Sequence, residues 1–140
     1  MELSEYEVLE DMLIGDLKVV QDVRLYRFTS DSVLLSKFAG VKPNDTVADF
    51  CSGCGIVAFH FHALHPNDKL SFTLFEMQPP LCALAQKTVE YNRFENVRIE
   101  NMRLQDIPSS YAGKFSLVLC NPPYERGGLE NENYEKAVCR

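Results

Sequence analysis

The stretch Asp49-Phe50-Cys51-Ser52-Gly53-Cys54-Gly55 decides the fold, because it joins an apolar run to a glycine-rich turn. The run from Thr46 to Phe50 predicts a buried strand, and the glycines precede a helix predicted over 56–64. A second signal, Asn121-Pro122-Pro123-Tyr124, follows an apolar run over 115–120. Both signals place polar or rigid residues where a buried strand surfaces. Since ligands bind at the carboxyl ends of strands in open α/β sheets, we expect the two segments to share one site.

Apolar strands alternate with helices on either side of the glycine-rich turn. The pattern predicts strands over 47–50, 70–75, 97–101 and 115–120, and helices over 31–39, 56–64 and 79–91. Such an alternation indicates βαβ units and a parallel sheet, so the predicted fold class is α/β. Upstream, 17–20 and 23–26 read as short strands, and the polar first ten residues read as a frayed end.

Composition narrows the class of protein. The chain has 140 residues, of which 46% are hydrophobic and 24% charged, as expected for one soluble domain. It has neither a signal-peptide pattern nor an apolar run of membrane-spanning length, which predicts a cytoplasmic protein with no membrane partner. The net charge of −6 argues weakly against a nucleic-acid partner.

Cysteine and histidine positions bear on metal binding. The five cysteines, an odd number, favour reduced thiols over a disulfide framework. Cys51-x-x-Cys54 lacks the second paired cluster that structural zinc normally requires. His60 and His62 point to different faces of their helix, and His65 lies at its end. We therefore predict no metal site.

The glycine-rich turn predicts a site for an adenosine-containing cofactor. Gly53 and Gly55 let the backbone approach a ligand closely, and the next helix presents unpaired N–H groups there. Asp49 ends the strand before the turn, and Glu76 ends the following strand. A carboxylate at the position of Glu76 can accept hydrogen bonds from ribose hydroxyls.

The Asn121–Tyr124 segment predicts chemistry at an amino group. Two prolines fix the backbone and leave the carbonyls of Asn121 and Pro122 without helical partners. The amide oxygen of Asn121 and a backbone carbonyl can grip both hydrogens of one –NH2 group. A conjugated amine is a poor nucleophile, and this grip orients its lone pair toward an electrophile. Tyr124 can stack on the planar group that carries the amine.

Taken in order, Asp49–Gly55, Glu76, Gln105-Asp106 and Asn121–Tyr124 resemble the motifs of S-adenosylmethionine-dependent methyltransferases that modify amino groups. The upstream stretch Tyr26-Arg27-Phe28-Thr29-Ser30-Asp31-Ser32-Val33-Leu34-Leu35 narrows the resemblance. It is similar to tRNA adenine-N(6)-methyltransferases, which modify an adenine beside the anticodon of a valine tRNA. The resemblance covers roughly residues 17–140. It implies a Rossmann-like class I methyltransferase fold, S-adenosylmethionine as cofactor and tRNA as the partner and substrate.

The resemblance also implies roles for individual residues. Glu76 would bind the ribose hydroxyls, Met77 would pack on the cofactor adenine, Asp106 would receive its amine, and the segment from Phe28 to Asp31 would cover the methionine end. The full set of implied cofactor-binding residues is Phe28, Asp31, Asp49, Cys51, Ser52, Gly53, Gly55, Glu76, Met77, Asp106 and Asn121. The implied catalytic residues are Asn121, Pro122, Pro123 and Tyr124, with Tyr124 stacking on a flipped-out base.

Two departures from the family pattern stand out. Ser116 occupies a position where the family commonly has aspartate. The chain also holds about four of the seven core strands of such folds. We expect 1–42 to form an N-terminal extension with a cofactor-covering helix, and 43–140 to form the N-terminal part of the methyltransferase domain. The open edge of the fourth strand predicts a homo-oligomer, and the 140-residue form is expected to lack measurable methyl transfer.

Two alternatives remain open at the level of sequence. A protein-glutamine N(5)-methyltransferase acting on release factors faces the same nucleophile problem, so Asn121–Tyr124 does not separate the two substrates. The acidic charge favours that alternative, whereas the stretch 28–35 favours the tRNA enzyme. An inactive cofactor-binding fragment is the third interpretation, favoured by the missing strands.

Overall fold

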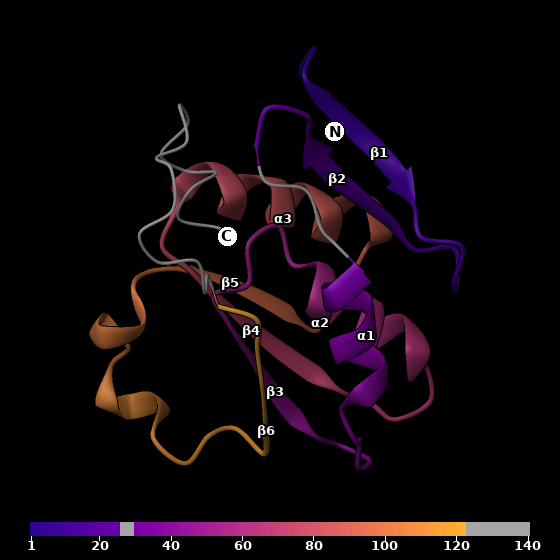
Figure 1. The fold of residues 1–140 in the computed structure, drawn as a ribbon. Coiled ribbons are helices and arrows are strands. Elements are labelled where there is room, and N and C mark those ends of the chain that lie inside the picture. Colours follow the sequence, from indigo (N-terminus) through magenta and orange to yellow (C-terminus); the bar gives the residue numbers. More distant parts are fainter. Residues whose placement is uncertain (26–29, 123–140) are drawn as a thin grey trace.

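The structure is a computed structural model that describes residues 1–25 and 30–122. Its central sheet has four parallel strands in the order β5-β4-β3-β6 (Figure 1). The strands are β3 (Thr46–Phe50), β4 (Ser71–Glu76), β5 (Val97–Asn101) and β6 (Leu117–Cys120). The predicted α/β class and parallel sheet are confirmed. The predicted fourth strand lies beside the first, so all four carboxyl ends meet at one edge of the sheet.

Three helices accompany the sheet: α1 (Ser30–Phe38), α2 (Ile56–Leu64) and α3 (Pro79–Asn92). Gly55 precedes α2 with φ 93°, a left-handed conformation that glycine adopts without strain. Two prolines open α3, where their missing N–H groups cost nothing, and Arg93 ends it in a left-handed conformation. The sequence prediction for α2 is confirmed at both ends, whereas α1 begins and ends one residue earlier than predicted and α3 ends one residue later.

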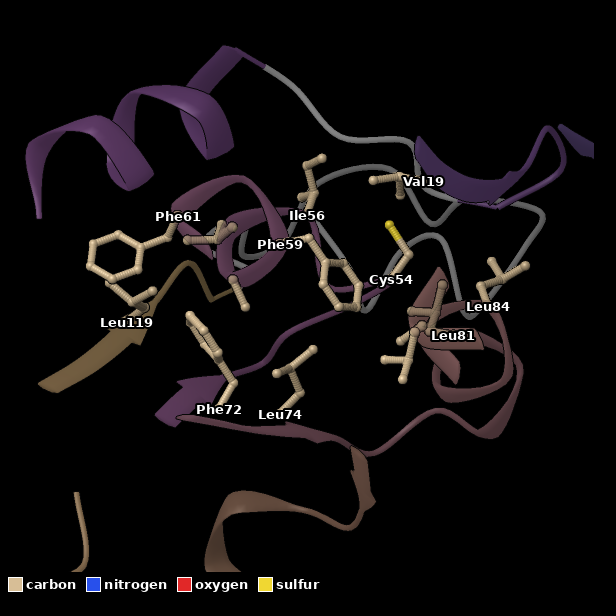
Figure 2. Close-up of a cluster of buried hydrophobic side chains, with 14 of the residues drawn as sticks. Val19, Cys54, Ile56, Phe59, Phe61, Phe72, Leu74, Leu81, Leu84 and Leu119 are labelled. Atoms are coloured by element: carbon tan, nitrogen blue, oxygen red, sulfur yellow. The ribbon is translucent and has the colours of Figure 1, made fainter. Parts of the chain in front are cut away.

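The core lies between one face of the sheet and the helices α2 and α3 (Figure 2). Phe59 and Phe61 of α2 and Leu81 of α3 are almost fully buried, and they belong to the same cluster as Phe72 and Leu74 of β4. Burial of these side chains fixes the strands against the helices. The ends of β3 and β4 are therefore held rigidly where the site forms.

The opposite face of the sheet is covered in part by the segment between β5 and β6. This segment contains two short 3-10 turns, Leu104–Asp106 and Ser109–Tyr111. The ring of Phe75 meets those of Tyr111 and Phe115 edge-on, at centroid distances of 5.4 and 5.9 Å. These ring contacts hold the segment beside the carboxyl end of β4.

The N-terminal region differs from its prediction. Residues expected to fray form β1 (Glu7–Asp11), which pairs antiparallel with β2 (Lys18–Asp22), and the hairpin packs on α3 (Figure 1). Thr88 and Asn92 of α3 hydrogen-bond to the backbone of β2, and the ammonium of Lys87 lies 2.5 Å from the carboxylate of Glu7. These partners come from a helix about 70 residues away, so the local pattern could not reveal them.

The second predicted upstream strand, 23–26, is wrong over the residues that the structure describes. Val23 and Arg24 form a turn after β2, because the carboxylate of Asp22 accepts hydrogen bonds from the backbone and guanidinium of Arg24. Such a local side-chain bond competes with strand pairing. Tyr26 lies outside the described residues.

Ser116, the departure from the family pattern, has a specific partner. Its hydroxyl donates to the carboxylate of Asp45 at 2.7 Å, which helps to hold the pKa of Asp45 below its usual value. An aspartate at 116 would face that carboxylate with a like charge. The serine therefore fits the acidic residue that precedes β3.

Among the described residues β6 pairs only with β3, and its side chain Val118 is 47% exposed. The described part of the chain contains no helix with the length and apolar character needed to cross a membrane.

Candidate functional site

A cavity of about 180 Å³ opens at the carboxyl ends of the parallel strands. Its walls come from the turn after β3, the end of β4, the segment after β5 and the residue that follows β6. The lining residues are Cys51, Gly53, Phe75, Glu76, Met77, Gln78, Met102, Arg103, Leu104, Gln105 and Asn121. The structure thus brings the two signals of the sequence, 49–55 and Asn121, to one site.

Glu76 is held in the wall by backbone groups from two elements. One carboxylate oxygen accepts from the N–H of Gly53 at 2.9 Å, and the other accepts from the N–H of Gln78 at 2.8 Å. The side chain is 5% exposed, and desolvation raises its pKa above the ordinary value. Each oxygen has further acceptor capacity, so the carboxylate can still accept bonds from a ligand's hydroxyls.

The glycines of the turn have different surroundings. Gly53 lines the cavity with φ 59°, and an added Cβ would meet nothing within 4 Å. Gly55 lies away from the cavity lining, and an added Cβ would approach the ring of Phe59. Gly53 therefore fits the predicted cofactor contact, whereas Gly55 serves the packing of α2.

Cys51 and Cys120 lie next to each other at the ends of β3 and β6. Their thiols are hydrogen-bonded, and burial raises the pKa of Cys51 to about 11. Both are therefore neutral thiols at physiological pH. Cys51 lines the cavity, and its φ of 57° turns the chain sharply at the strand end.

Asp49 and Ser52 are close in sequence to the lining residues Cys51 and Gly53 and do not line the cavity themselves. Asp49 is 1% exposed and accepts a hydrogen bond from the backbone of Ala58, while its Oδ2 has no partner among the described residues. Desolvation raises its pKa to about 8. The hydroxyl of Ser52 is likewise buried without a described partner. Buried polar atoms without a partner are uncommon in folded proteins, so the end of β3 is a strained or water-binding part of the fold.

Asn121 both lines the cavity and contacts α1. It is half-buried, lines the cavity, and its Nδ2 donates to the hydroxyl of Ser32 at 3.4 Å. Pro122 follows it in an exposed position. Three predicted site residues, Phe28, Pro123 and Tyr124, lie outside the described residues.

The remaining predicted cofactor-binding residues differ in whether they line the cavity. Met77 lines the cavity with 40% of its surface exposed, which leaves an apolar face for a planar ligand. Asp106 is exposed beside the lining and is ion-paired with Arg103 at 2.7 Å. Asp31 is exposed in the first turn of α1 and does not line the cavity.

Sequence reasoning missed Met102 and Leu104, which line the cavity from the segment after β5. A usable signal was their place directly after a strand that neighbours β4, since strand ends meet at one edge.

The histidines have partners other than metals. His60 is hydrogen-bonded to Ser36, His62 to Asn96, and His65 lies 3.8 Å from Asp68. Over residues 1–25 and 30–122 no three His, Cys, Asp or Glu side chains cluster closely enough to hold a metal ion.

Comparison with known proteins places the chain among methyltransferases. The family model described as the methyltransferase small domain matches residues 29–139. Among curated proteins, the tRNA1(Val) (adenine(37)-N6)-methyltransferase of Haemophilus influenzae (strain PittGG) is 26% identical over 121 residues. That alignment covers 86% of this chain and 52% of the relative. The protein of the same name from Pedobacter heparinus is 25% identical over 115 residues, covering 81% and 47%. The chain thus spans about half the length of the curated relatives it matches.

Solved structures share the fold at low identity. A human methyltransferase 10 domain containing protein superposes with a TM-score of 0.63 at 15% identity, over 79% of this chain and 56% of that one. P. horikoshii TYW2 in complex with MeSAdo gives 0.58 at 20% identity, over 75% and 39%. The fold is that of the Rossmann-like class I methyltransferases, as the sequence predicts.

Proposed function

This chain belongs to the methyltransferase small domain family, and we propose that it transfers a methyl group from S-adenosylmethionine to the exocyclic amine of an adenine in tRNA. One observation carries the proposal. The strand-end carboxylate of Glu76 and the amide of Asn121 line the same cavity. A group that suits ribose hydroxyls therefore lies close to a group that suits an amine.

The residues present fit the cofactor. Glu76 accepts the ribose hydroxyls while the backbone N–H groups of Gly53 and Gln78 keep its carboxylate in place. Met77 and Leu104 supply apolar surface for an adenine ring. Asp49 is buried and does not line the cavity, so its carboxyl group supports the strand end next to Cys51 and is not assigned a contact with the cofactor. When bound, S-adenosylmethionine supplies an electrophilic methyl group on a sulfonium.

Asn121 prepares the nucleophile. The lone pair of the adenine amine is delocalised into the ring, which makes the amine unreactive. The Oδ1 of Asn121 and the carbonyl of Pro122 accept hydrogen bonds from its two N–H groups. These bonds favour a pyramidal nitrogen with its lone pair directed at the methyl group. The contribution is one of positioning and preorganised electrostatics.

The target that we propose is the adenine beside the anticodon of a valine tRNA. The curated relatives carry that activity in their names, and the upstream stretch 26–35 resembles the same family. The resemblance to that family also supports a role for Tyr124 in stacking on the flipped-out base. A tRNA substrate also places the activity in the cytoplasm.

Label partition between two substrates tests the substrate class. Radiolabelled S-adenosylmethionine is incubated with bulk tRNA and with a release factor. The enzyme is either this chain or a longer version, in which this chain is fused to the second half of the Haemophilus influenzae relative. Label is expected in tRNA. The net charge of −6 favours the protein-glutamine alternative, and label in the release factor alone would establish it. Cofactor binding without label in either substrate would indicate the inactive fragment.

We further propose that the 140-residue form self-associates through β6. The outer edge of β6 is unpaired among the described residues, and the side chain of Val118 is exposed on a face of the sheet at this strand. Unpaired apolar edges recruit a second chain. Light scattering should show a dimer or larger species, and a stable monomer at the same concentration would refute this proposal.

A further inference from the structure

We propose that Ser32 is a positioning residue for Asn121, which fixes the side-chain amide so that its oxygen faces the substrate amine. The inference rests on the proposed function for its catalytic meaning and on the structure for its geometry. Ser32 lies on α1, 89 residues from Asn121 in the sequence, and its side chain does not line the cavity.

The hydrogen bond between the two residues defines the direction of the amide. Nδ2 of Asn121 donates to Oγ of Ser32 at 3.4 Å, and Ser32 is only 2% exposed. The bonds to Nδ2 and Oδ1 diverge by about 120° in a planar amide, so a nitrogen directed at α1 turns the oxygen away from α1. Asn121 itself lines the cavity and no described residue of α1 does, so an oxygen turned away from α1 is free to face the cavity.

This direction matters for the proposed chemistry. The substrate amine presents N–H donors, and only the oxygen of Asn121 can accept them. A rotated amide would present its own N–H groups and repel the substrate. The bond to Ser32 is long for a hydrogen bond, which is common for catalytic groups before the substrate is bound.

The helix that carries Ser32 is itself anchored one turn further on. Ser36 is fully buried, its hydroxyl donates to the carbonyl of Val33 at 2.7 Å, and it lies 2.6 Å from Nδ1 of His60 on α2. The hydroxyl of Ser36 therefore bonds both to the backbone of its own helix and to the ring of His60. Burial lowers the pKa of His60, which keeps the ring neutral at physiological pH. Ser32 thus acts from a helix fixed to α2.

Two serines at equivalent burial on one helix provide a matched pair of variants. Ser32→Ala removes the acceptor for Asn121, whereas Ser36→Ala removes the bond to His60 and leaves that acceptor in place. Ser32→Thr keeps a hydroxyl at position 32, and Ser32→Cys keeps the volume with a much weaker acceptor. Any general loosening of α1 should appear in Ser36→Ala as well.

The primary measurement is the side-chain amide signal of Asn121 in a nitrogen–proton correlation spectrum of the free 140-residue chain. Asn121→Ala identifies the signal by its loss. Ser32→Ala and Ser32→Cys are expected to shift this signal, whereas Ser32→Thr and Ser36→Ala leave it near its original position. An unshifted signal in Ser32→Ala would overturn the proposal.

Kinetics of the longer version provide the second readout. Ser32→Ala should lower kcat about five- to tenfold, the factor for one neutral hydrogen bond, with KM for S-adenosylmethionine unchanged and activity restored in Ser32→Thr. Unchanged kcat, or no recovery in Ser32→Thr, would refute the catalytic part. The spectrum is recorded without cofactor or substrate, so it tests the contact between Ser32 and Asn121 independently of the proposed function. A shifted signal in a protein that does not methylate adenine would support the contact and refute the proposed function.

Discussion

Glu76→Ala provides a quantitative test of the cofactor site. The carboxylate is almost fully buried, and each oxygen already accepts one backbone N–H, from Gly53 and Gln78. Its remaining acceptor capacity is what the proposed ribose hydroxyls would use. Losing charge-assisted hydrogen bonds of this kind costs about 1–3 kcal/mol. The dissociation constant for S-adenosylmethionine should therefore rise by a factor between about 5 and 150 in titration calorimetry.

Asn101→Ala is the control for damage to the strand end. Its side-chain amide donates to the backbone carbonyls of Glu76 and Met77 at 3.0 and 3.1 Å and does not contact the carboxylate. This variant should lower the melting temperature with little effect on the dissociation constant. The reasoning would be refuted by unchanged affinity in Glu76→Ala, or by an equal loss in Asn101→Ala.

Four further variants test three separate parts of the site. Gly55→Ala should destabilise the protein by about 2–3 kcal/mol in denaturant unfolding, because the residue has φ 93° and its new Cβ would clash with Phe59. Gly53→Ala should cost only about 1–2 kcal/mol, because only the positive φ opposes the new side chain. Equal costs would contradict the assignment of Gly55 to packing and Gly53 to the cavity. Burial raises the pKa of Asp49 to about 8 in the folded protein, whereas the unfolded chain releases this proton near pH 4. The contribution of Asp49 to folding stability is therefore complete below about pH 4 and declines as the pH rises to about 8. Asp49→Asn should flatten that decline in melting temperatures between pH 5 and 8.5, and an unchanged slope would show that Asp49 is ionised. Asn121→Ala should abolish methyl transfer by the longer version while cofactor affinity stays nearly intact, and parallel loss of both would mean that the residue is structural.

The sheet and its helices could be predicted because their signals are local. Gly55 and Pro66 delimit α2 in the sequence itself, and the apolar runs mark β3 and β6. The apolar run over 17–20 predicted β2, but β1 and its pairing with β2 could not be predicted, since the hairpin is held by the side chains of Thr88 and Asn92 of α3.

The sequence predicted the kind of site, a cofactor pocket at the strand ends, but only some of the residues that line it. The sequence indicated Glu76, Met77 and Asn121, which line the cavity. It could not separate Gly53, which lines the cavity, from Gly55, which packs on Phe59, because both glycines belong to the same motif. The contact between Asn121 and Ser32 joins segments 89 residues apart and carries no signature in either.

Identification of the methylated nucleoside tests the central claim most directly. Bulk tRNA is treated with S-adenosylmethionine and the longer version, digested to nucleosides and analysed by mass spectrometry. The proposal predicts that N(6)-methyladenosine accumulates, and that Asn121→Ala prevents its accumulation. A methyl group on a ring nitrogen or on another base, formed equally well by Asn121→Ala, would contradict the account of an amine held by this residue.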